Sequence, residues 1–334
     1  MRVIAGKHRG AVLNEFAASN IRPTADRTKE SVFNIISDFV HDSVCLDLFC
    51  GTGNLGIEAL SRGAKEVVFV DNSKESVALT KKNLEKVREN AKVFLSDAIS
   101  FLKTQTKKYD IIFIDPPYGS DVSIIAVKTI FENDLLTQNG IIVFERDVPF
   151  VSDMPGISVF DQRKYGKAVI SFVRKTRKCL FAGTFDPFTS GHEDVVKTAT
   201  KRYDEIHVCV MNNPSKKPLF LLQDRLEIIQ KSLIKYEKII VSSWDGLLVD
   251  YMKKHGILVN VRGIRDDKDL GYEKEMERVN MEYYPDIIYD YIYTGNPVSS
   301  SFVRETIENG GDISFYVNKN ALNLINKAYQ SKTK

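Results

Sequence analysis

The sequence lacks any long apolar run, and this absence excludes one class of protein. No stretch of the 334 residues approaches the ~20 consecutive apolar residues that a membrane-spanning helix needs. The first ten residues, MRVIAGKHRG, also lack the apolar core of a secretory signal peptide. With 43% hydrophobic and 27% charged residues, the composition is typical of a soluble globular protein. We therefore expect a cytoplasmic protein.

Cysteine is scarce as well. The four cysteines (Cys45, Cys50, Cys179 and Cys209) show no CxxC spacing, and two of them lie in apolar, strand-like runs. Such residues are most often small members of a buried core in a reducing compartment, which is the role we predict for them. We name no side chain of this sequence as a metal ligand.

An excess of charge of one sign is also missing. The chain has 24 basic and 22 acidic residues up to Thr176 and 23 and 22 after it, so neither half is a basic domain. Only the first thirty residues are uneven, because three acids accompany the basic residues Arg2, Lys7, Arg9, Arg22, Arg27 and Lys29. This segment is either a solvated surface or an arm that contacts the phosphates of a nucleic acid.

What the sequence does contain is two successive series of strands and helices, and its length allows two domains. In the first half, strand-like runs such as VVFVD (67–71) alternate with helical patterns, and the apolar strand 169–173 closes the series. A second series starts with CLFAG (179–183), with no spacer rich in Pro, Gly or Ser before it. We expect helices there over 191–203, 223–236, 246–255, 272–284 and 300–309. The pattern predicts two tandem Rossmann-like α/β domains with mainly parallel sheets, over residues 1–176 and 177–334.

A glycine-rich turn in the first half predicts a nucleoside-containing ligand. Gly51-Thr-Gly53-Asn-Leu-Gly56 matches the GxGxxG dinucleotide pattern, and Asp71 lies 20 residues beyond Gly51, where a ribose-binding acid belongs. The pattern alone is weak and would equally suit an NAD enzyme. Asp47, at the end of the preceding strand, favours S-adenosylmethionine instead. An acid suits the cationic methionine end of that ligand and would be unhelpful beside a pyrophosphate.

The sequence Asp115-Pro116-Pro117-Tyr118 follows a buried strand and indicates the acceptor of the methyl group. The Pro116 carbonyl lacks a ladder partner, so it and Asp115 can both accept hydrogen bonds from an exocyclic amino group. Two such bonds help to localise the nitrogen lone pair for attack on a sulfonium methyl, and Tyr118 offers a stacking face for a flipped base. Together with the acids Asp47, Asp71 and Asp97 at strand ends, this predicts a methyltransferase, although the motif does not separate adenine N6 from guanine N2.

Residues 1–176 resemble a known family through IAGKHRG, RPTADRTKESVFN, DLFCGTGNLGIEALSRGA, DPPY and YGKAVISFVRK. This combination is similar to the enzymes that methylate guanine N2 in small-subunit ribosomal RNA. The resemblance implies S-adenosylmethionine as donor and rRNA in a ribosomal particle as substrate. It also implies that Asp71 holds the ribose hydroxyls and Asp97 the adenine amino group. A DNA adenine methyltransferase is the alternative, against which the lack of a target-recognition insert argues.

The second half carries Thr189-Ser-Gly191-His192, downstream of TFDP, at the expected start of a helix. A glycine permits close backbone approach there, and a histidine can donate to a phosphate beside the positive helix N-terminus. The block resembles the HxGH nucleotidyltransferases. With SKKPLF, VRGIRDDKDLGYE, Asn280 and VSSSFVRE, residues 177–332 resemble phosphopantetheine adenylyltransferase.

That resemblance implies transfer of AMP from ATP to 4′-phosphopantetheine, which gives dephospho-coenzyme A and pyrophosphate. Its implied contacts to the incoming phosphate come from Thr184, Lys216 and Arg262, while His192 stabilises the α-phosphate and Arg265 the outgoing phosphates. ATP would be bound, with Mg²⁺ bridging its phosphates, by Phe185, Gly263, Glu273, Ser299, Ser300 and Ser301. Surface ion pairing with Asp266, Asp267 and Asp269 is the alternative role for the two arginines.

The resemblance also implies a homo-oligomer, commonly a hexamer, formed through the second half. We therefore predict a bifunctional transferase. The alternative is that one half has lost activity and serves as a binding or scaffold module.

Overall fold

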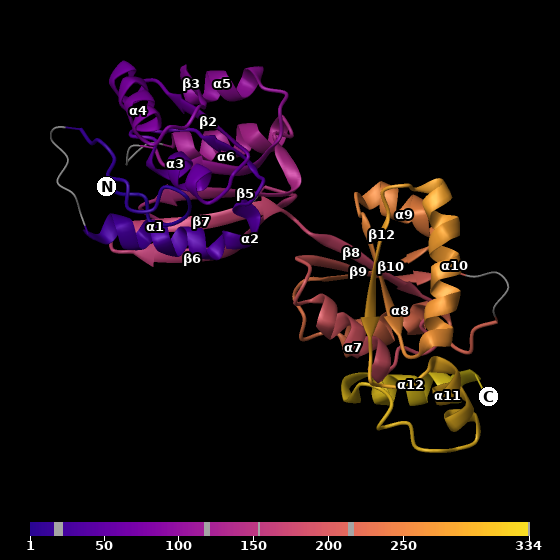
Figure 1. The fold of residues 1–334 in the computed structure, drawn as a ribbon. Coiled ribbons are helices and arrows are strands. Elements are labelled where there is room, and N and C mark those ends of the chain that lie inside the picture. Colours follow the sequence, from indigo (N-terminus) through magenta and orange to yellow (C-terminus); the bar gives the residue numbers. More distant parts are fainter. Residues whose placement is uncertain (17–22, 117–120, 153, 213–216, 333–334) are drawn as a thin grey trace. The chain divides into compact units, whose positions relative to one another are not determined.

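The computed structural model describes residues 1–16, 23–116, 121–152, 154–212 and 217–332. The chain forms two compact units, Met1–Lys175 and Thr176–Lys334, each with a sheet of its own (Figure 1). We call them unit 1 and unit 2. Within the described ranges, no helix is both long enough and apolar enough to cross a membrane.

Unit 1 contains a seven-stranded sheet in the order β3-β2-β1-β4-β5-β7-β6. The first five strands along the chain are parallel, and β6 and β7 are antiparallel. The strands are β1 (Val44–Asp47), β2 (Glu66–Asp71), β3 (Lys92–Leu95), β4 (Tyr109–Ile114), β5 (Leu136–Arg146), β6 (Ile157–Tyr165) and β7 (Ala168–Lys175). The strand expected to close this sheet, β7, instead lies inside it, because β6 pairs along its outer side.

Helices cover both faces of the unit 1 sheet. Buried side chains of α1–α4, such as Phe33 and Ile57, pack with Phe69 and Phe113 on one face. Those of α5 and α6, such as Phe101, pack on the other face. The helices are α1 (Pro23–Ile35), α2 (Ser37–Val40), α3 (Asn54–Ser61), α4 (Lys74–Lys86), α5 (Ala98–Thr104) and α6 (Val122–Glu132). This arrangement leaves the carboxyl ends of the parallel strands open at one edge for ligands.

Unit 2 contains a five-stranded, fully parallel sheet in the order β10-β9-β8-β11-β12. Its strands are β8 (Lys178–Gly183), β9 (Glu205–Met211), β10 (Ile239–Trp244), β11 (Val259–Ile264) and β12 (Ile288–Tyr293). Its helices are α7 (Ser190–Ala199), α8 (Leu222–Ser232), α9 (Leu248–His255), α10 (Asp267–Tyr283), α11 (Ser300–Glu308) and α12 (Lys319–Lys332). Two mainly parallel α/β sheets in tandem confirm the predicted fold class.

Two helices of unit 2 depart from the sequence-based expectation. Helix α10 begins at Asp267, five residues before the predicted start, because the Asp266 side chain caps it by accepting a hydrogen bond from the Asp269 N–H. Helix α12 was not predicted; it packs on the core through Ala321 and Ile325. The four cysteines are buried and unpaired, as predicted.

Candidate functional sites

The candidate site of unit 1 lies where β1, β2 and β4 end. Because these strands are parallel neighbours, their terminal acids Asp47, Asp71 and Asp115 reach the same edge of the sheet. The turn Cys50–Asn54, which we call the glycine turn, follows β1. Gly51 and Gly53 have φ values of 53° and 77°, which other residues adopt only with strain. The Gly51 N–H donates to Asp71 Oδ2 at 2.9 Å, so the turn and the end of β2 are joined directly.

Asp47 and Asp115 are acids whose ionised forms are disfavoured in this structure. Asp47 is buried, and desolvation raises its pKa to about 7; the charge of Asp71 adds to this, and a hydrogen bond from the Gly56 N–H opposes it. The Asp115 carboxyl is reached by solvent at the surface but is crowded by protein atoms, and this desolvation, together with the charges of Glu145 and Asp47, raises its pKa. A cationic ligand bound at these strand ends would stabilise the ionised carboxylates, so the arrangement favours a cation.

The remaining predicted residues of unit 1 that the structure describes, Asp97 and Pro116, also follow strands of this sheet. Asp97 follows β3, which pairs with β2, and its side chain accepts a hydrogen bond from the Ser100 N–H at the start of α5. Hydrogen bonds from Ser100 hold the pKa of Asp97 low, so it is ionised at neutral pH. Pro116 is buried directly after Asp115. Tyr118 lies outside the described residues.

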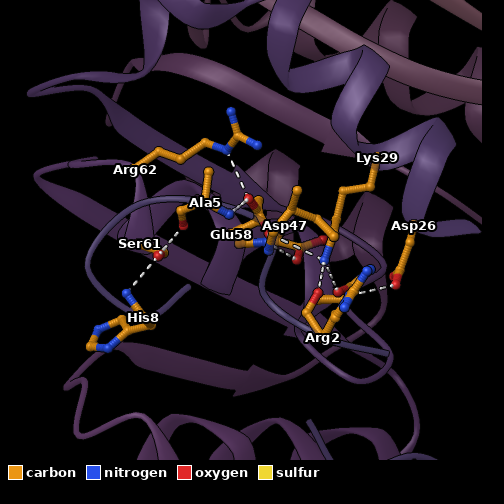
Figure 2. A network of polar contacts seen from close by, with 12 residues as sticks. Arg2, Ala5, His8, Asp26, Lys29, Asp47, Glu58, Ser61 and Arg62 are labelled. Atoms are coloured by element: carbon orange, nitrogen blue, oxygen red, sulfur yellow. Dashed lines mark hydrogen bonds and ion pairs between the residues drawn. The ribbon is translucent and has the colours of Figure 1, made fainter. Parts of the chain in front are cut away.

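Residues 1–16, which we call the N-terminal arm, are held to α3 by a buried ionic network (Figure 2). Glu58 is fully buried and accepts hydrogen bonds from the Ile4 and Ala5 N–H groups at 2.8 and 3.0 Å. It also pairs with Lys29 at 3.2 Å and with Arg62 at 2.8 Å. The buried Lys29 ammonium also donates to Arg2 O and to Asn54 Oδ1.

These contacts correct part of the prediction that the basic residues among the first thirty contact phosphates. Lys29 is a structural residue, because its ammonium is already surrounded by protein acceptors. Lys7 pairs with Glu89 at 2.6 Å. Arg9 and Arg27 are exposed, and neither has an ionic partner among the residues that the structure describes. They remain the candidates for phosphate contact.

Unit 2 has a cavity of about 570 Å³ at the carboxyl ends of β8 and β11. All the predicted site residues of this unit that the structure describes line the cavity: Thr184, Phe185, His192, Arg262, Gly263, Arg265, Glu273, Ser299, Ser300 and Ser301. Lys216 lies outside the described residues. Segments more than 100 residues apart in the sequence thus converge on one space.

The His192 imidazole has a defined tautomer in this cavity. The Thr189 N–H donates to Nδ1 at 3.0 Å, so Nδ1 is unprotonated and the ring proton is on Nε2. Burial, with the charges of Arg265 and Arg262, lowers the pKa of His192 to about 3. The ring packs among Phe181, Phe185 and Phe188, which fixes its plane. His192 is therefore a neutral Nε2–H donor at physiological pH.

The two predicted arginines are held by acids on α10. Arg262 makes a two-pronged pair with Glu273, in which Nε donates to Oε2 at 2.6 Å and Nη2 donates to Oε1, and Nη1 donates to Ala182 O. Arg265 pairs in the same manner with Asp269, at 2.7 and 3.0 Å. Of the acids expected as alternative partners, Asp269 does pair with Arg265. Arg262 pairs instead with Glu273, which was not among them. A guanidinium has more N–H donors than these bonds use, so both still offer donors to the cavity.

Two helix N-termini also point at this site. Helix α7 starts at Ser190, and a Cβ at Gly191 would lie 3.0 Å from Val298 O, so any other residue would require a small shift of the backbone here. Helix α11 is capped by Ser299, which accepts from the Phe302 N–H at 3.1 Å. At position 263 glycine is needed for a different reason, because a Cβ there would lie 2.6 Å from the Val195 side chain. The site thus combines two partial positive charges with arginines, as a polyphosphate requires.

Three further residues of the cavity were not predicted. Arg304 donates to Asp186 O at 2.6 Å and to Ser301 Oγ at 3.1 Å, and Lys217 lines the cavity. The buried Asp186 carboxylate accepts the Leu219 and Phe220 N–H groups at 2.8 and 2.9 Å, which anchors the segment after Lys217. Arg304 and Asp186 lie inside VSSSFVRE and TFDP, so the motifs were the available signal. Within the described parts of both units, no cluster of three or more potential metal-ligating side chains occurs.

Comparison with known proteins assigns a family to each unit. Residues 1–174 match the family described as Conserved hypothetical protein 95, and residues 180–306 match the family described as Cytidylyltransferase-like. The Ribosomal RNA small subunit methyltransferase D of Haemophilus influenzae is 38% identical over 159 residues, which cover 46% of this chain and 82% of that protein. The Phosphopantetheine adenylyltransferase of Petrotoga mobilis is 38% identical over 146 residues, which cover 43% of this chain and 90% of that protein.

The chain belongs to both families, one in each half. A second Phosphopantetheine adenylyltransferase, from Ralstonia pickettii, is 40% identical over 141 residues, which cover 41% of this chain and 84% of that protein. The relatives in the two halves are a methyltransferase and adenylyltransferases, which are enzymes that transfer a group, and the chain is a transferase.

Proposed function

We propose that the chain is a bifunctional enzyme with one active site in each half. Residues 1–176 would methylate guanine N2 in small-subunit rRNA, and residues 177–334 would transfer AMP from ATP to 4′-phosphopantetheine. The relatives named above support the two activities. The observation that carries the proposal is the opposite chemistry of the two sites, an acidic strand edge in unit 1 and an arginine-rich cavity in unit 2.

In unit 1 the described residues suit S-adenosylmethionine, which when bound supplies an electrophilic methyl on a sulfonium cation. The glycine turn presents its backbone at the end of β1, and the acids Asp47, Asp71 and Asp115 favour a cation there. Asp71 would hold the ribose hydroxyls and Asp97 the adenine amino group. Asp115 and the Pro116 carbonyl would accept from the guanine amino group, and Tyr118 would stack on the flipped base.

In unit 2 the protein's task is orientation and charge neutralisation, because a phosphate dianion needs no general base to attack the α-phosphorus. The Nε2–H of His192 would donate to the α-phosphate, with no proton to lose at neutral pH. Thr184, Lys216 and Arg262 would position the incoming phosphate, and Arg265 would neutralise the outgoing pyrophosphate.

The remaining contacts would bind ATP. We assign them to Phe185, Gly263, Glu273 and the start of α11 at Ser299, Ser300 and Ser301. Mg²⁺ would arrive with ATP as the complex of its phosphates, so it needs few ligands from the protein.

A homo-oligomer through unit 2 is also part of the proposal. Helix α10 has no buried residue, and Tyr272, Met276, Val279 and Tyr283 form an exposed apolar stripe along it. An apolar stripe of this kind favours a second copy of the chain, up to a hexamer. We expect both reactions to take place in the cytoplasm, where rRNA and ATP are both present.

The test is to assay the intact chain for both reactions. Small ribosomal subunits without the guanine methylation are incubated with labelled S-adenosylmethionine, and ATP is incubated separately with 4′-phosphopantetheine. Label on a guanine N2 and formation of dephospho-coenzyme A are expected. Activity of one half alone would favour the alternative in which the other half is a binding module. Label on duplex DNA adenine would contradict the rRNA assignment.

A further inference from the structure

The side-chain amide of Asn83, on α4, joins two segments that are far apart in the sequence. Its Nδ2 donates to Thr52 O in the glycine turn at 2.9 Å and to Asn14 O in the N-terminal arm at 3.1 Å. Its Oδ1 accepts from the Asn14 N–H at 2.7 Å. Asn83 is fully buried, so water does not compete for these bonds. One amide thus holds the backbone of the arm and the backbone of the turn together.

Lys29 makes a second connection between the same two segments. Its ammonium donates to Arg2 O near the start of the arm at 2.7 Å and to Asn54 Oδ1 at the end of the turn at 2.6 Å. Both ends of the arm are therefore tied to the turn by buried side chains. A buried polar group that loses its partner destabilises the protein, so a shift of the turn is transmitted to the arm more readily than the bonds break.

We propose that Asn83 is a positioning residue that couples donor binding at the glycine turn to RNA binding by the N-terminal arm. This inference rests on the proposed function of unit 1. A ligand shifts a protein only through its different affinities for two arrangements, and the turn is the segment whose arrangement a bound donor would select. Through Asn83 that arrangement also sets the position of Asn14, and through Lys29 that of Arg2. Donor and RNA should each strengthen the binding of the other by the same factor.

Thr80 provides a matched control on the same helix. It is also fully buried, and its hydroxyl donates to Gly51 O in the same turn at 2.9 Å. Its other contact is with the Cys50 thiol, and among the described residues of the arm it has no hydrogen-bond partner. Thr80→Val therefore removes a hydrogen bond to the turn and keeps the side-chain shape, while the link through Asn83 remains. Asn83→Ala removes the link from both segments.

Asn83→Asp provides a second variant should the alanine variant not fold. The carboxylate retains an oxygen that can accept from the Asn14 N–H, but it has no N–H to donate to Thr52 O. The connection to the arm is partly kept and the connection to the turn is lost. Hydrogen exchange in β1 and β2 checks the folding of unit 1 in each variant.

The experiment measures the affinity of the full chain for unmethylated small ribosomal subunits, with and without saturating S-adenosylhomocysteine. In the wild type and in Thr80→Val, S-adenosylhomocysteine should increase the affinity for the subunits by ~5-fold or more. In Asn83→Ala and Asn83→Asp the two affinities should be nearly equal. The reciprocal measurement, the affinity for S-adenosylhomocysteine with and without subunits, should give the same factors.

Three outcomes would overturn the inference. A wild type that methylates the subunits but shows no coupling would overturn it and leave the proposed function standing. Coupling that survives in both Asn83 variants, or that is lost equally in Thr80→Val, would show that the amide bridge does not carry it. A wild type that neither methylates nor binds the subunits would overturn the inference together with the proposed function.

Discussion

The two candidate sites use the same kind of scaffold with opposite electrostatics. Each lies at the carboxyl ends of parallel strands, after a glycine-containing turn that leads into a helix. In unit 1 the strands end in acids, and desolvation with neighbouring carboxylates raises the pKa of Asp47 and Asp115, whereas in unit 2 the cavity gathers Lys217, Arg262, Arg265 and Arg304. The fold supplies the position, and the side chains at the strand ends decide between a cationic and a polyanionic ligand.

The variant with the largest expected effect tests the cationic side of this comparison. His192→Ala removes a neutral donor aimed at the α-phosphate, and we expect adenylyl transfer to fall by ~10²–10³-fold. Substrate affinity should change much less than turnover, since Arg265, Glu273 and the start of α11 remain. Steady-state kinetics with ATP and 4′-phosphopantetheine separate the two effects.

Methyl transfer by the same variant is the control, because unit 1 has its own sheet and core. An enzyme that keeps full adenylyl transfer would leave His192 as a helix-capping residue only. Loss of both activities in a folded protein would contradict the independence of the two sites.

Asp115→Ala tests the acidic side. It removes one of the two proposed acceptors for the guanine amino group, and we expect methyl transfer to fall by ~10²-fold or more. Single-turnover methylation of small subunits measures the loss, while equilibrium binding of S-adenosylhomocysteine should persist. Adenylyl transfer should be unaffected by this change, because the site of unit 2 is separate. Methylation at the original rate would mean that the DPPY segment is only a turn.

The contrast in charge also predicts different pH responses. Desolvation places the pKa of Asp47 near 7, so the carboxyl gains a proton as the pH falls from 8 to 6 and its attraction for a sulfonium cation weakens. S-Adenosylmethionine affinity should therefore drop several-fold, by less than the ~10-fold per pH unit that a single proton allows. His192, with its pKa near 3, stays neutral throughout that range. Calorimetric titrations at pH 6 and 8 compare donor binding in the wild type and in Asp47→Asn, where the pH dependence should shrink.

The same group should make unit 1 less stable as the pH rises. The pKa of Asp47 in the folded state is raised above its value in the unfolded state. Between about pH 4 and pH 7 the folded state therefore still holds a proton that the unfolded state has already released. Its contribution is thus lost as the pH rises and is unfavourable above 7. Asp47→Asn keeps an acceptor for the Gly56 N–H, and at pH 8 it should raise the free energy of unfolding of unit 1 by roughly 1–3 kcal/mol. Hydrogen exchange in β1 and β2 measures this.

Unit 2 contains the control for that measurement. The single tryptophan, Trp244, lies in β10, so its fluorescence follows unit 2 alone and should not change in Asp47→Asn. A variant of equal or lower stability would mean that the folded protein already stabilises the ionised Asp47 carboxylate.

Much of the fold could be predicted because strand and helix periodicities recur clearly in both halves. Candidate site residues could also be predicted where a motif places them close together in the sequence, as for Gly191 and His192. Contacts between residues far apart in the sequence could not be predicted. The pairing of Arg262 with Glu273 and the burial of Lys29 against Glu58 depend on how α10 and α3 pack, which no local pattern encodes. The half-buried edge strand β6 was missed because its sequence, ISVFDQRKY, is too polar to predict a strand.

The smallest expected effect concerns the basic residues among the first thirty, and the burial of Lys29 refines the prediction made for them. Of the basic residues at the front, Arg9 and Arg27 are exposed, and Arg22 lies outside the described residues. Replacing all three by Ala should weaken binding to small subunits and reduce the salt dependence, because each lost phosphate contact lowers the slope of log K against log salt by ~0.7–0.9. Titrations at several salt concentrations give this slope, and Lys201→Ala, which changes a surface cation of unit 2, is the control.

Lys29→Ala should act differently: it leaves Glu58 without one of its buried partners and lowers the stability of unit 1 while the slope stays the same. An unchanged slope in the triple variant would return these arginines to an ordinary solvated surface, and a slope that falls in Lys29→Ala without loss of stability would contradict the structural role of that lysine.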